Sequence, residues 1–145
     1  MKMIIRLSLL IMIMAISGKN IVFAQDAESS VKAALVTLFE LSKSKTYEKA
    51  ATLIAYEGDD KARIRKDSYN PLNKDEIGQV KRVCKKISAL IDLSSKQENG
   101  RFQKEKDGAL DTFILEVNFI SGDQKLVTAF TFIKTEKGFL LTDIN

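Results

Sequence analysis

The last third of the chain alternates apolar and polar side chains around two glycine-containing turns, and no other feature constrains the fold as strongly. Asp107-Gly108 and Gly122-Asp123 each have the composition of a two-residue hairpin turn, which requires positive backbone angles. Pairing the strands around the second turn opposes four pairs of residues: Phe119 with Leu126, Val117 with Thr128, Leu115 with Phe130, and Phe113 with Phe132. Pairing around the first turn places Phe102 opposite Phe113.

Both pairings bring the strand aromatics to one face of the predicted sheet, whereas a slip by one residue would divide them between the two faces. The predicted helix-facing surface consists of Phe102, Phe113, Leu115, Val117, Phe119, Leu126, Thr128, Phe130 and Phe132. Such a surface either lines an apolar cavity or forms solid core. The outer face is mixed and we expect it to be half covered, with Ile114, Ala129, Thr131 and Ile133 exposed. A last strand spans Phe139 to Ile144, and its register stays open.

The region before the sheet has helical periodicity. Ser29 or Ser30 can cap a helix with an apolar face of Val31, Ala34, Leu35, Leu38 and Leu41. Thr46 can cap a second helix, which uses Tyr47, Ala50, Ala51 and Ile54. After a long polar segment from Glu57 to Leu72, Asn73 and Glu76 form a capping-box pattern before an amphipathic helix with the face Ile77, Val80, Cys84, Ile87 and Ile91. The sequence therefore predicts an α+β fold, in which a helical hairpin and a long amphipathic helix pack on a curved antiparallel meander.

The first 24 residues have the three regions of a secretory signal peptide. Lys2 and Arg6 precede an apolar run from Leu7 to Ile16, and small residues stand before Gln25. The run is shorter than the roughly 20 residues that span a membrane, and Gln25 stands where a lipid-anchored protein needs cysteine. We therefore expect a signal peptide at 1–24 and one domain at 25–145. The product would be soluble, periplasmic or extracellular, and without a stable membrane anchor after cleavage.

Charge and composition exclude several functions. Without Lys2, Arg6 and Lys19, the 23 basic residues fall to 20, against 19 acidic residues, so a general affinity for nucleic acid loses its support. The chain has no histidine, so the commonest acid/base group and metal ligand is missing. Cys84 is its single cysteine. Cys84 lies on an apolar helical face, where we expect an inert core thiol. Glu57, Asp59 and Asp60 fit no calcium loop. We predict no metal and no cofactor.

Three segments carry a family resemblance: Val31-Lys32-Ala33-Ala34-Leu35, Tyr47-Glu48-Lys49-Ala50-Ala51, and Gly138-Phe139-Leu140-Leu141-Thr142-Asp143. With the order of elements, they resemble the cystatin-like, nuclear-transport-factor-2-like superfamily, most of all its small exported bacterial members of unassigned activity. The resemblance implies a cone-shaped sheet wrapped on the long helix, a cavity between them, and homodimers through the outer sheet face. Isomerase-type members use carboxylates and tyrosine in that cavity.

The predicted helix-facing surface contains no carboxylate, which disfavours catalysis. We therefore expect a non-catalytic exported module that binds a small apolar ligand or a partner protein. The alternative is a small isomerase or dehydratase in which Asp143 acts as base with a tyrosine, Tyr47 or Tyr56, in the cavity. That alternative requires Asp143 to be buried in a cavity with a tyrosine close by.

Overall fold

A computed structural model describes the backbone of residues 2–145 and the side chains from Phe23 onward. The chain divides into two compact units, Met1–Ser30 and Val31–Asn145. Helix α1 (Lys2–Lys43) runs through the boundary, so the predicted helix start at Ser29 or Ser30 is wrong. Most of the predicted signal peptide falls outside the described side chains, and its cleavage stays a prediction. Within the described residues, no helix is both long and apolar enough to cross a membrane.

The part of α1 in the second unit buries the predicted apolar face, with Val31, Leu35 and Leu38 almost inaccessible to solvent. The helix ends at Lys43, and Lys45 then adopts a left-handed conformation with φ of 57°. Helix α2 (Tyr47–Ala51) is shorter than expected. Its N-cap is Thr46 as predicted, but the Thr46 hydroxyl is hydrogen-bonded to Ser44 at 2.8 Å instead of to the helix backbone.

Helix α3 (Lys74–Asp92) begins at the predicted cap and buries the predicted face. The Asn73 side-chain oxygen accepts hydrogen bonds from the backbone N–H groups of Asp75 and Glu76, at 3.0 and 3.3 Å. These bonds satisfy two of the donors that a helix start leaves free. The buried residues of α3 are Val80, Cys84, Ile87 and Ile91, all on the predicted face.

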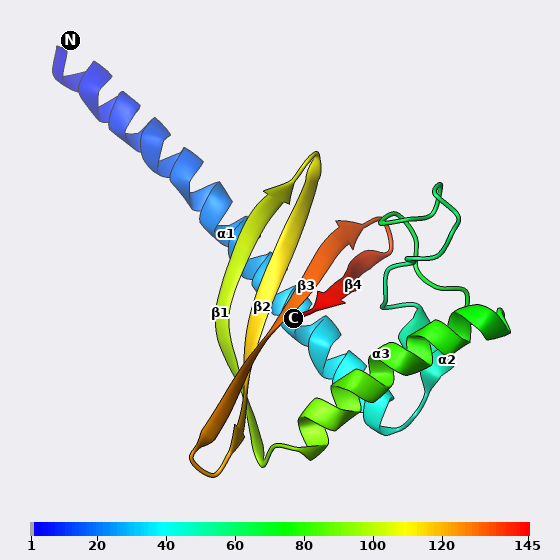
Figure 1. Ribbon diagram of the computed structural model, residues 1–145. Helices are drawn as coiled ribbons and strands as arrows, with labels where there is room; N and C mark the ends of the chain where they lie inside the picture. Colours follow the sequence, from blue (N-terminus) through cyan, green and yellow to red (C-terminus); the bar gives the residue numbers. More distant parts are fainter. Residues whose placement is uncertain (1) are drawn as a thin grey trace. The chain divides into compact units, whose positions relative to one another are not determined.

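Four antiparallel strands complete the second unit: β1 (Lys96–Asp107), β2 (Leu110–Ser121), β3 (Gln124–Thr135) and β4 (Gly138–Ile144). They lie side by side in the order β1-β2-β3-β4 (Figure 1). Helices followed by an open antiparallel sheet confirm the predicted α+β class.

The register around Gly122 is the predicted one, with Phe119 opposite Leu126 and Phe113 opposite Phe132. The first turn is displaced by one residue and consists of Gly108 and Ala109, because Asp107 pairs with Leu110. Gly108 has φ of 62°, so the glycine takes the first central position, where a type II′ turn requires it. Phe102 therefore lies opposite Leu115 instead of Phe113.

The displaced turn changes the register of residues 102–107 by two residues, which leaves Phe102 on its predicted face. Between Asn99 and Phe102 a bulge shifts the register of β1 by one residue, so the start of the strand does not keep the predicted alternation. The helix-facing side is consequently a layer of aromatic rings. Phe39 of α1 lies 6.0 Å from Phe119 and 5.7 Å from Phe130 between ring centroids. On the same layer, Phe113 contacts Phe139 edge to face at 5.1 Å. These rings hold the helical part of the second unit against the sheet.

We expect Phe130→Ala to lower the free energy of unfolding by about 3–5 kcal/mol, because it deletes a fully buried ring from this layer. Leu126 is the matched control, since it lies on the same face of β3 but is 55% exposed. Leu126→Ala should cost less than about 1 kcal/mol. Urea unfolding followed by circular dichroism measures both. Equal losses for the two variants would contradict a core centred on Phe130.

Candidate functional site

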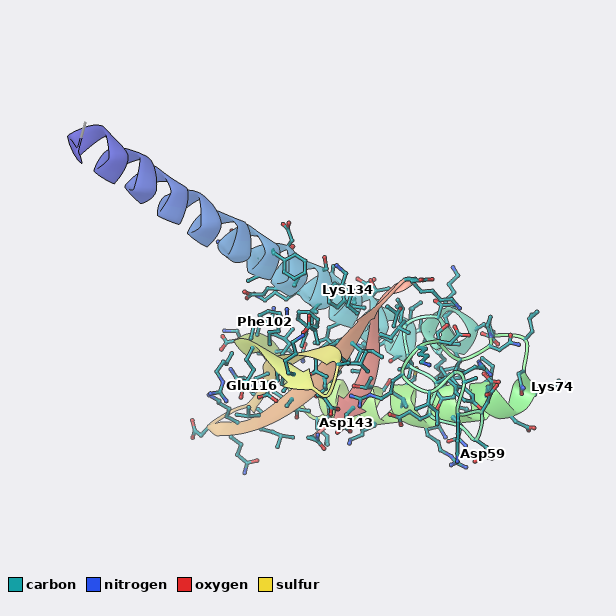
Figure 2. The ribbon with its side chains drawn as sticks, turned by 90° about the horizontal axis from the view of Figure 1, so that it is seen from above. Asp59, Lys74, Phe102, Glu116, Lys134 and Asp143 are labelled. Atoms are coloured by element: carbon teal, nitrogen blue, oxygen red, sulfur yellow. The ribbon has the colours of Figure 1, made fainter. Side chains whose placement is uncertain are left out.

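A bulge in β4 places Asp143 on the outer face of the sheet. The turn at Glu136-Lys137 sets Phe132 opposite Leu141, and continued pairing would put Asp143 opposite Phe130 on the aromatic side. The register shifts by one residue at Thr142, so Asp143 instead lies opposite Thr131. Figure 2 shows Asp143 and Glu116 on one side of the sheet, and Phe102 and Lys134 on the other.

The segment that follows α2 covers part of the same outer face. Ile54, predicted to be helical, instead pairs with β4: the Ala55 N–H donates to the Leu141 carbonyl at 2.8 Å, and the Leu141 N–H donates to the Leu53 carbonyl at 2.9 Å. Ala55 packs with Ile133 and Leu140 in a buried cluster. The expectation that Ile133 is exposed is therefore wrong, because this segment covers it.

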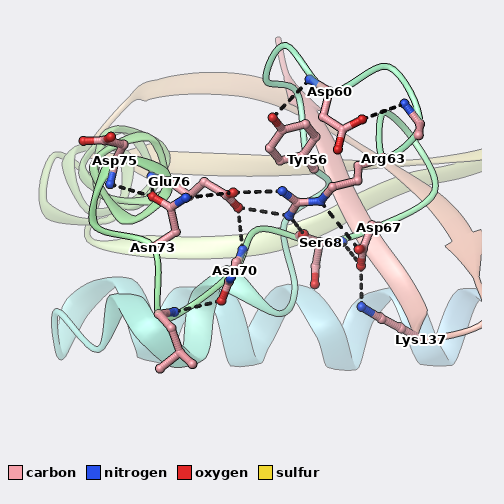
Figure 3. Close-up of polar contacts among 12 residues, drawn as sticks. Tyr56, Asp60, Arg63, Asp67, Ser68, Asn70, Asn73, Asp75, Glu76 and Lys137 are labelled. Atoms are coloured by element: carbon pink, nitrogen blue, oxygen red, sulfur yellow. Dashed lines mark hydrogen bonds and ion pairs between the residues drawn. The ribbon is translucent and has the colours of Figure 1, made fainter.

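Arg63 fixes the long polar segment in place (Figure 3). Its two terminal nitrogens donate to the two carboxylate oxygens of Glu76, at 2.8 and 3.0 Å, and one of them also donates to the Ser68 carbonyl at 2.9 Å. The guanidinium carbon lies 3.9 Å from the centre of the Tyr56 ring. The bidentate pair holds the segment to the first turn of α3, and such pairs are among the strongest in proteins.

Further contacts complete this anchor. The Glu76 carboxylate also accepts from the Asn70 backbone N–H at 2.6 Å, and the hydrogen bond from Arg63 holds the pKa of Glu76 below its ordinary value. Asp67 pairs with Lys137, which keeps the pKa of Asp67 low as well. Gly58 allows the chain to fold against Tyr56, since a Cβ at residue 58 would lie 2.3 Å from the Tyr56 hydroxyl. The segment is therefore a fixed part of the fold.

Sheet and segment together border an open groove of about 730 Å³ on the outer face, which we call the outer groove. Its floor consists of β-branched side chains from three strands: Thr112, Ile114, Thr131 and Thr142. Its rim is charged and consists of Glu57, Arg65, Glu105, Lys106, Asp107 and Asp143. A groove with a weakly polar floor and a few charged groups has the composition of a binding site.

The two basic side chains of the rim are already paired with carboxylates. Arg65 forms an ion pair with Asp107 at 2.6 Å, and Lys106 forms one with Asp111 at 2.7 Å. Glu57 is different: partial desolvation of its carboxyl raises its pKa, the negative charge of Asp143 raises it further, and Arg65 opposes this. Glu57 and Asp143 therefore lie close enough to repel each other.

A smaller pocket of about 150 Å³ adjoins these carboxylates. Its apolar wall includes Ile54, Ala55, Val83 and Leu141, and Glu57, Tyr69, Lys86 and Asp143 supply its polar groups. Burial raises the pKa of the Tyr69 phenol. Lys86 donates to the Ile144 carbonyl at 2.5 Å, which ties α3 to β4. Glu57, Thr142 and Asp143 line both this pocket and the outer groove.

The residues predicted to line a cavity are mostly packed core. Six of them have at most 4% of their surface exposed: Phe113, Leu115, Val117, Phe119, Phe130 and Phe132. Thr128 is equally buried, and Phe102 is half-buried with its ring stacked 6.3 Å from that of Phe113. Phe119 also borders a separate surface groove with Leu90, Leu93 and Leu126. Ring contacts within this layer favour solid core over a ligand cavity.

The polar candidates from the sequence do not gather at one place. Tyr47 lies beside α3, with the Lys81 ammonium 5.8 Å from its ring centre. Tyr56 is buried under Arg63 and contacts Tyr69 at 5.5 Å between ring centres. Asp143 is exposed, and the tyrosine that shares its pocket is Tyr69.

Sequence reasoning did not identify Glu57 and Arg65 as neighbours of Asp143. Glu57 and Asp143 are separated by most of the domain in sequence, so no local spacing relates them. The unusual length of the polar segment marked it as a region of interest, and its Glu57, Asp59 and Asp60 were considered only as a calcium loop, which they do not fit. Its acidic residues do not cluster: within the described residues, no group of three or more metal-ligating side chains is placed to hold a metal ion. Cys84 is buried, and burial raises the pKa of its thiol.

Comparison of the chain with family models, curated proteins and solved structures gives no match.

We expect Arg63→Ala to lower the free energy of unfolding at pH 7 by about 1–3 kcal/mol, because it leaves the half-buried Glu76 carboxylate without its main donor. Arg82→Ala is the matched control, since Arg82 is exposed on α3 and its side chain donates a hydrogen bond to the neutral side chain of Gln79. The control should change stability by less than about 0.5 kcal/mol.

The loss in free energy of unfolding caused by Arg63→Ala should become smaller as the pH falls. The pKa of Glu76 is lower in the folded protein than its ordinary value of 4.5, so its contribution is present above pH 4.5 and is lost as the pH falls through the folded-state pKa. Urea unfolding of wild type and variant across this range measures the difference. A cost that stays constant down to about pH 2 would contradict the ionic anchor.

Proposed function

We propose that residues Val31–Asn145 form a non-catalytic binding module of an exported protein, and that the ligand or partner binds the outer face of the sheet. The outer groove, of about 730 Å³, is the observation that carries this proposal. On the opposite face the rings of Phe119 and Phe130 contact each other and Phe39 of the same chain, and the groove beside Leu126 lies at the edge of this layer. A charged rim favours a polar ligand or a protein surface over the apolar ligand that the aromatic strands led us to expect.

The proposal also covers family and location. The order of the elements, helices followed by an antiparallel meander, supports membership of the cystatin-like, nuclear-transport-factor-2-like superfamily and its cone-shaped sheet. The basic start, apolar run and small residues before Gln25 support export and removal of residues 1–24. A second copy of the chain is one partner that could bind the outer face and form a homodimer. Ile114, Ala129 and Thr131 are half-buried on that face.

The alternative, an isomerase or dehydratase with Asp143 as base, has one observation in its favour: Asp143 and Tyr69 line the same pocket. The candidates Tyr47 and Tyr56 contact other groups, as described above. Asp143 is exposed, whereas the enzyme interpretation requires a buried carboxylate. The pocket of about 150 Å³ is also small for a substrate that must be enclosed from water. These points favour the binding module.

The test compares two substitutions on the outer face of β2. Ile114→Trp fills the floor of the outer groove, and Asn118→Trp adds the same ring on the same strand and face, at a residue that does not line the groove. Wild type and both variants are purified from the exported fraction of their native host, and bound molecules are identified by mass spectrometry. Intact mass should show a chain that begins at Gln25.

We expect the molecule recovered with wild type to accompany Asn118→Trp and to be absent from Ile114→Trp. The recovered molecule should leave the complex chemically unchanged after incubation. Equal recovery with both variants would contradict binding at the outer groove, and conversion of the molecule to a product would favour the enzyme alternative. Retention of residues 1–24 would contradict processing by export.

A further inference from the structure

A row of basic side chains lies along the exposed side of α3. Lys81, Arg82 and Lys85 stand on neighbouring turns of the helix, and all three are exposed. Among the residues whose side chains are described, none of the three forms an ion pair with a carboxylate. The four basic residues of β1 differ, because each of them pairs with an acidic residue. The positive charge of α3 is therefore directed to solvent.

The turn between α1 and α2 extends this row. Ser42 lies against Cys84, and the Lys81 ammonium lies 5.8 Å from the centre of the Tyr47 ring. Both ends of the turn thus contact α3, and residues 43–46 run beside it. Both lysines of the turn are exposed and, in the described part of the chain, form no ion pair. The basic surface consists of Lys43, Lys45, Lys81, Arg82 and Lys85.

Acidic residues at the border do not neutralise the basic surface. Glu40, Glu48 and Asp92 are nearby in the sequence and are exposed. Within the described side chains, none of them forms an ion pair with the basic surface. The basic surface keeps an excess of positive charge, although basic and acidic residues are nearly balanced after residue 24. The charge of the domain is therefore unevenly distributed.

Exposed leucines continue the same side of α3. Leu93 keeps helical backbone angles, with φ of −81°, and lies about three turns after Arg82 on the same stripe of the helix. It is 78% exposed and lines an open groove of about 680 Å³ with Leu126, which is 55% exposed. Lys125 is the charged residue among the described residues that line this groove, and no carboxylate is among them. Basic and apolar groups thus share one continuous surface.

We propose that this surface binds an anionic lipid bilayer, with the basic surface at the phosphate headgroups and Leu93 and Leu126 at the start of the acyl chains. Basic helices that also carry exposed apolar side chains bind in the interfacial plane of such bilayers. The two leucines protrude from the surface instead of lining a closed slot, which favours a bilayer over an acidic peptide. Binding of this kind is reversible and weakens with salt, so it differs from an anchor. The inference does not depend on the outer groove, which other residues line.

The test is co-sedimentation of the purified exported protein with vesicles of equal parts phosphatidylglycerol and phosphatidylcholine. Pure phosphatidylcholine vesicles are the uncharged control. The helix variant combines Lys81→Gln, Arg82→Gln and Lys85→Gln. All proteins share the same N-terminus, so any contribution of residues 1–24 is the same in each of them.

The matched control for charge is a strand variant that combines Arg101→Gln, Lys104→Gln and Lys106→Gln. It loses the same net charge from β1, where these residues pair with acidic side chains. Leu126→Ala tests the apolar part, and Val127→Ala is its control, because Val127 is 48% exposed on the opposite face of β3. Thermal unfolding of each variant establishes that it is folded.

We expect wild type to bind the anionic vesicles and the helix variant to bind them about a hundredfold more weakly. The strand variant should lose less than about threefold, since its charges lie elsewhere. Leu126→Ala should weaken binding about fivefold, and Val127→Ala should bind as wild type does. Binding by wild type should fall as sodium chloride rises from about 0.05 to about 0.5 M.

The proposal is overturned if wild type binds phosphatidylcholine vesicles as tightly as anionic ones, or if the helix and strand variants lose binding equally, because net charge alone would then explain it. Unchanged binding by Leu126→Ala would remove the apolar contact. Displacement of the protein from the vesicles by polyglutamate at equal charge concentration would assign the surface to an acidic protein partner instead.

Discussion

Strand register is the constraint on which the rest of this structure depends. A β-strand gives alternate side chains to opposite faces, so the turns decide which residues become core and which reach the surface. The turns at Gly108 and Gly122 put the rings of Phe113, Phe119 and Phe130 on one face. Phe39 of α1 packs on that face, which leaves the outer face for another use.

The outer face acquires its shape from a single extra residue and a single ion pair. The bulge at Thr142 reverses the facing of Asp143 without disturbing Phe132 or Leu141, which pair before it. Arg63 then holds the segment that carries Glu57 through its bidentate bond to Glu76. The two devices are far apart in sequence and meet at one groove. The packed aromatic layer and the outer groove therefore lie on opposite faces of the same sheet.

Much of the fold follows from local sequence. The register of β2 with β3, the cap at Asn73 and the buried face of α3 are all predicted, because each depends on residues within a few positions of one another. The same local reasoning places the first turn one residue early, since Asp-Gly and Gly-Ala turns compete at that site and the type II′ form takes Gly108 first.

The site is less predictable for a physical reason. Proximity of Glu57 to Asp143 depends on the bulge at Thr142, which no turn signal marks, and on Arg63 reaching Glu76 in the next element. Ile54 also leaves its predicted helix because the edge of β4 offers it backbone partners. Pairing between segments that are far apart in the sequence overrides local helical propensity. Local patterns therefore mark Asp143 as a candidate but do not show that Glu57 lines the same groove.

Nuclear Overhauser spectroscopy on methyl and aromatic groups tests most directly whether the aromatic layer and the cluster around Ile133 lie on opposite faces of the sheet. We predict cross-peaks from the Ala55 methyl to the methyls of Ile133 and Leu140, and from the Phe39 ring to the rings of Phe119 and Phe130. Cross-peaks from Ile133 to the Phe39 ring would place both sets on one face and contradict the account.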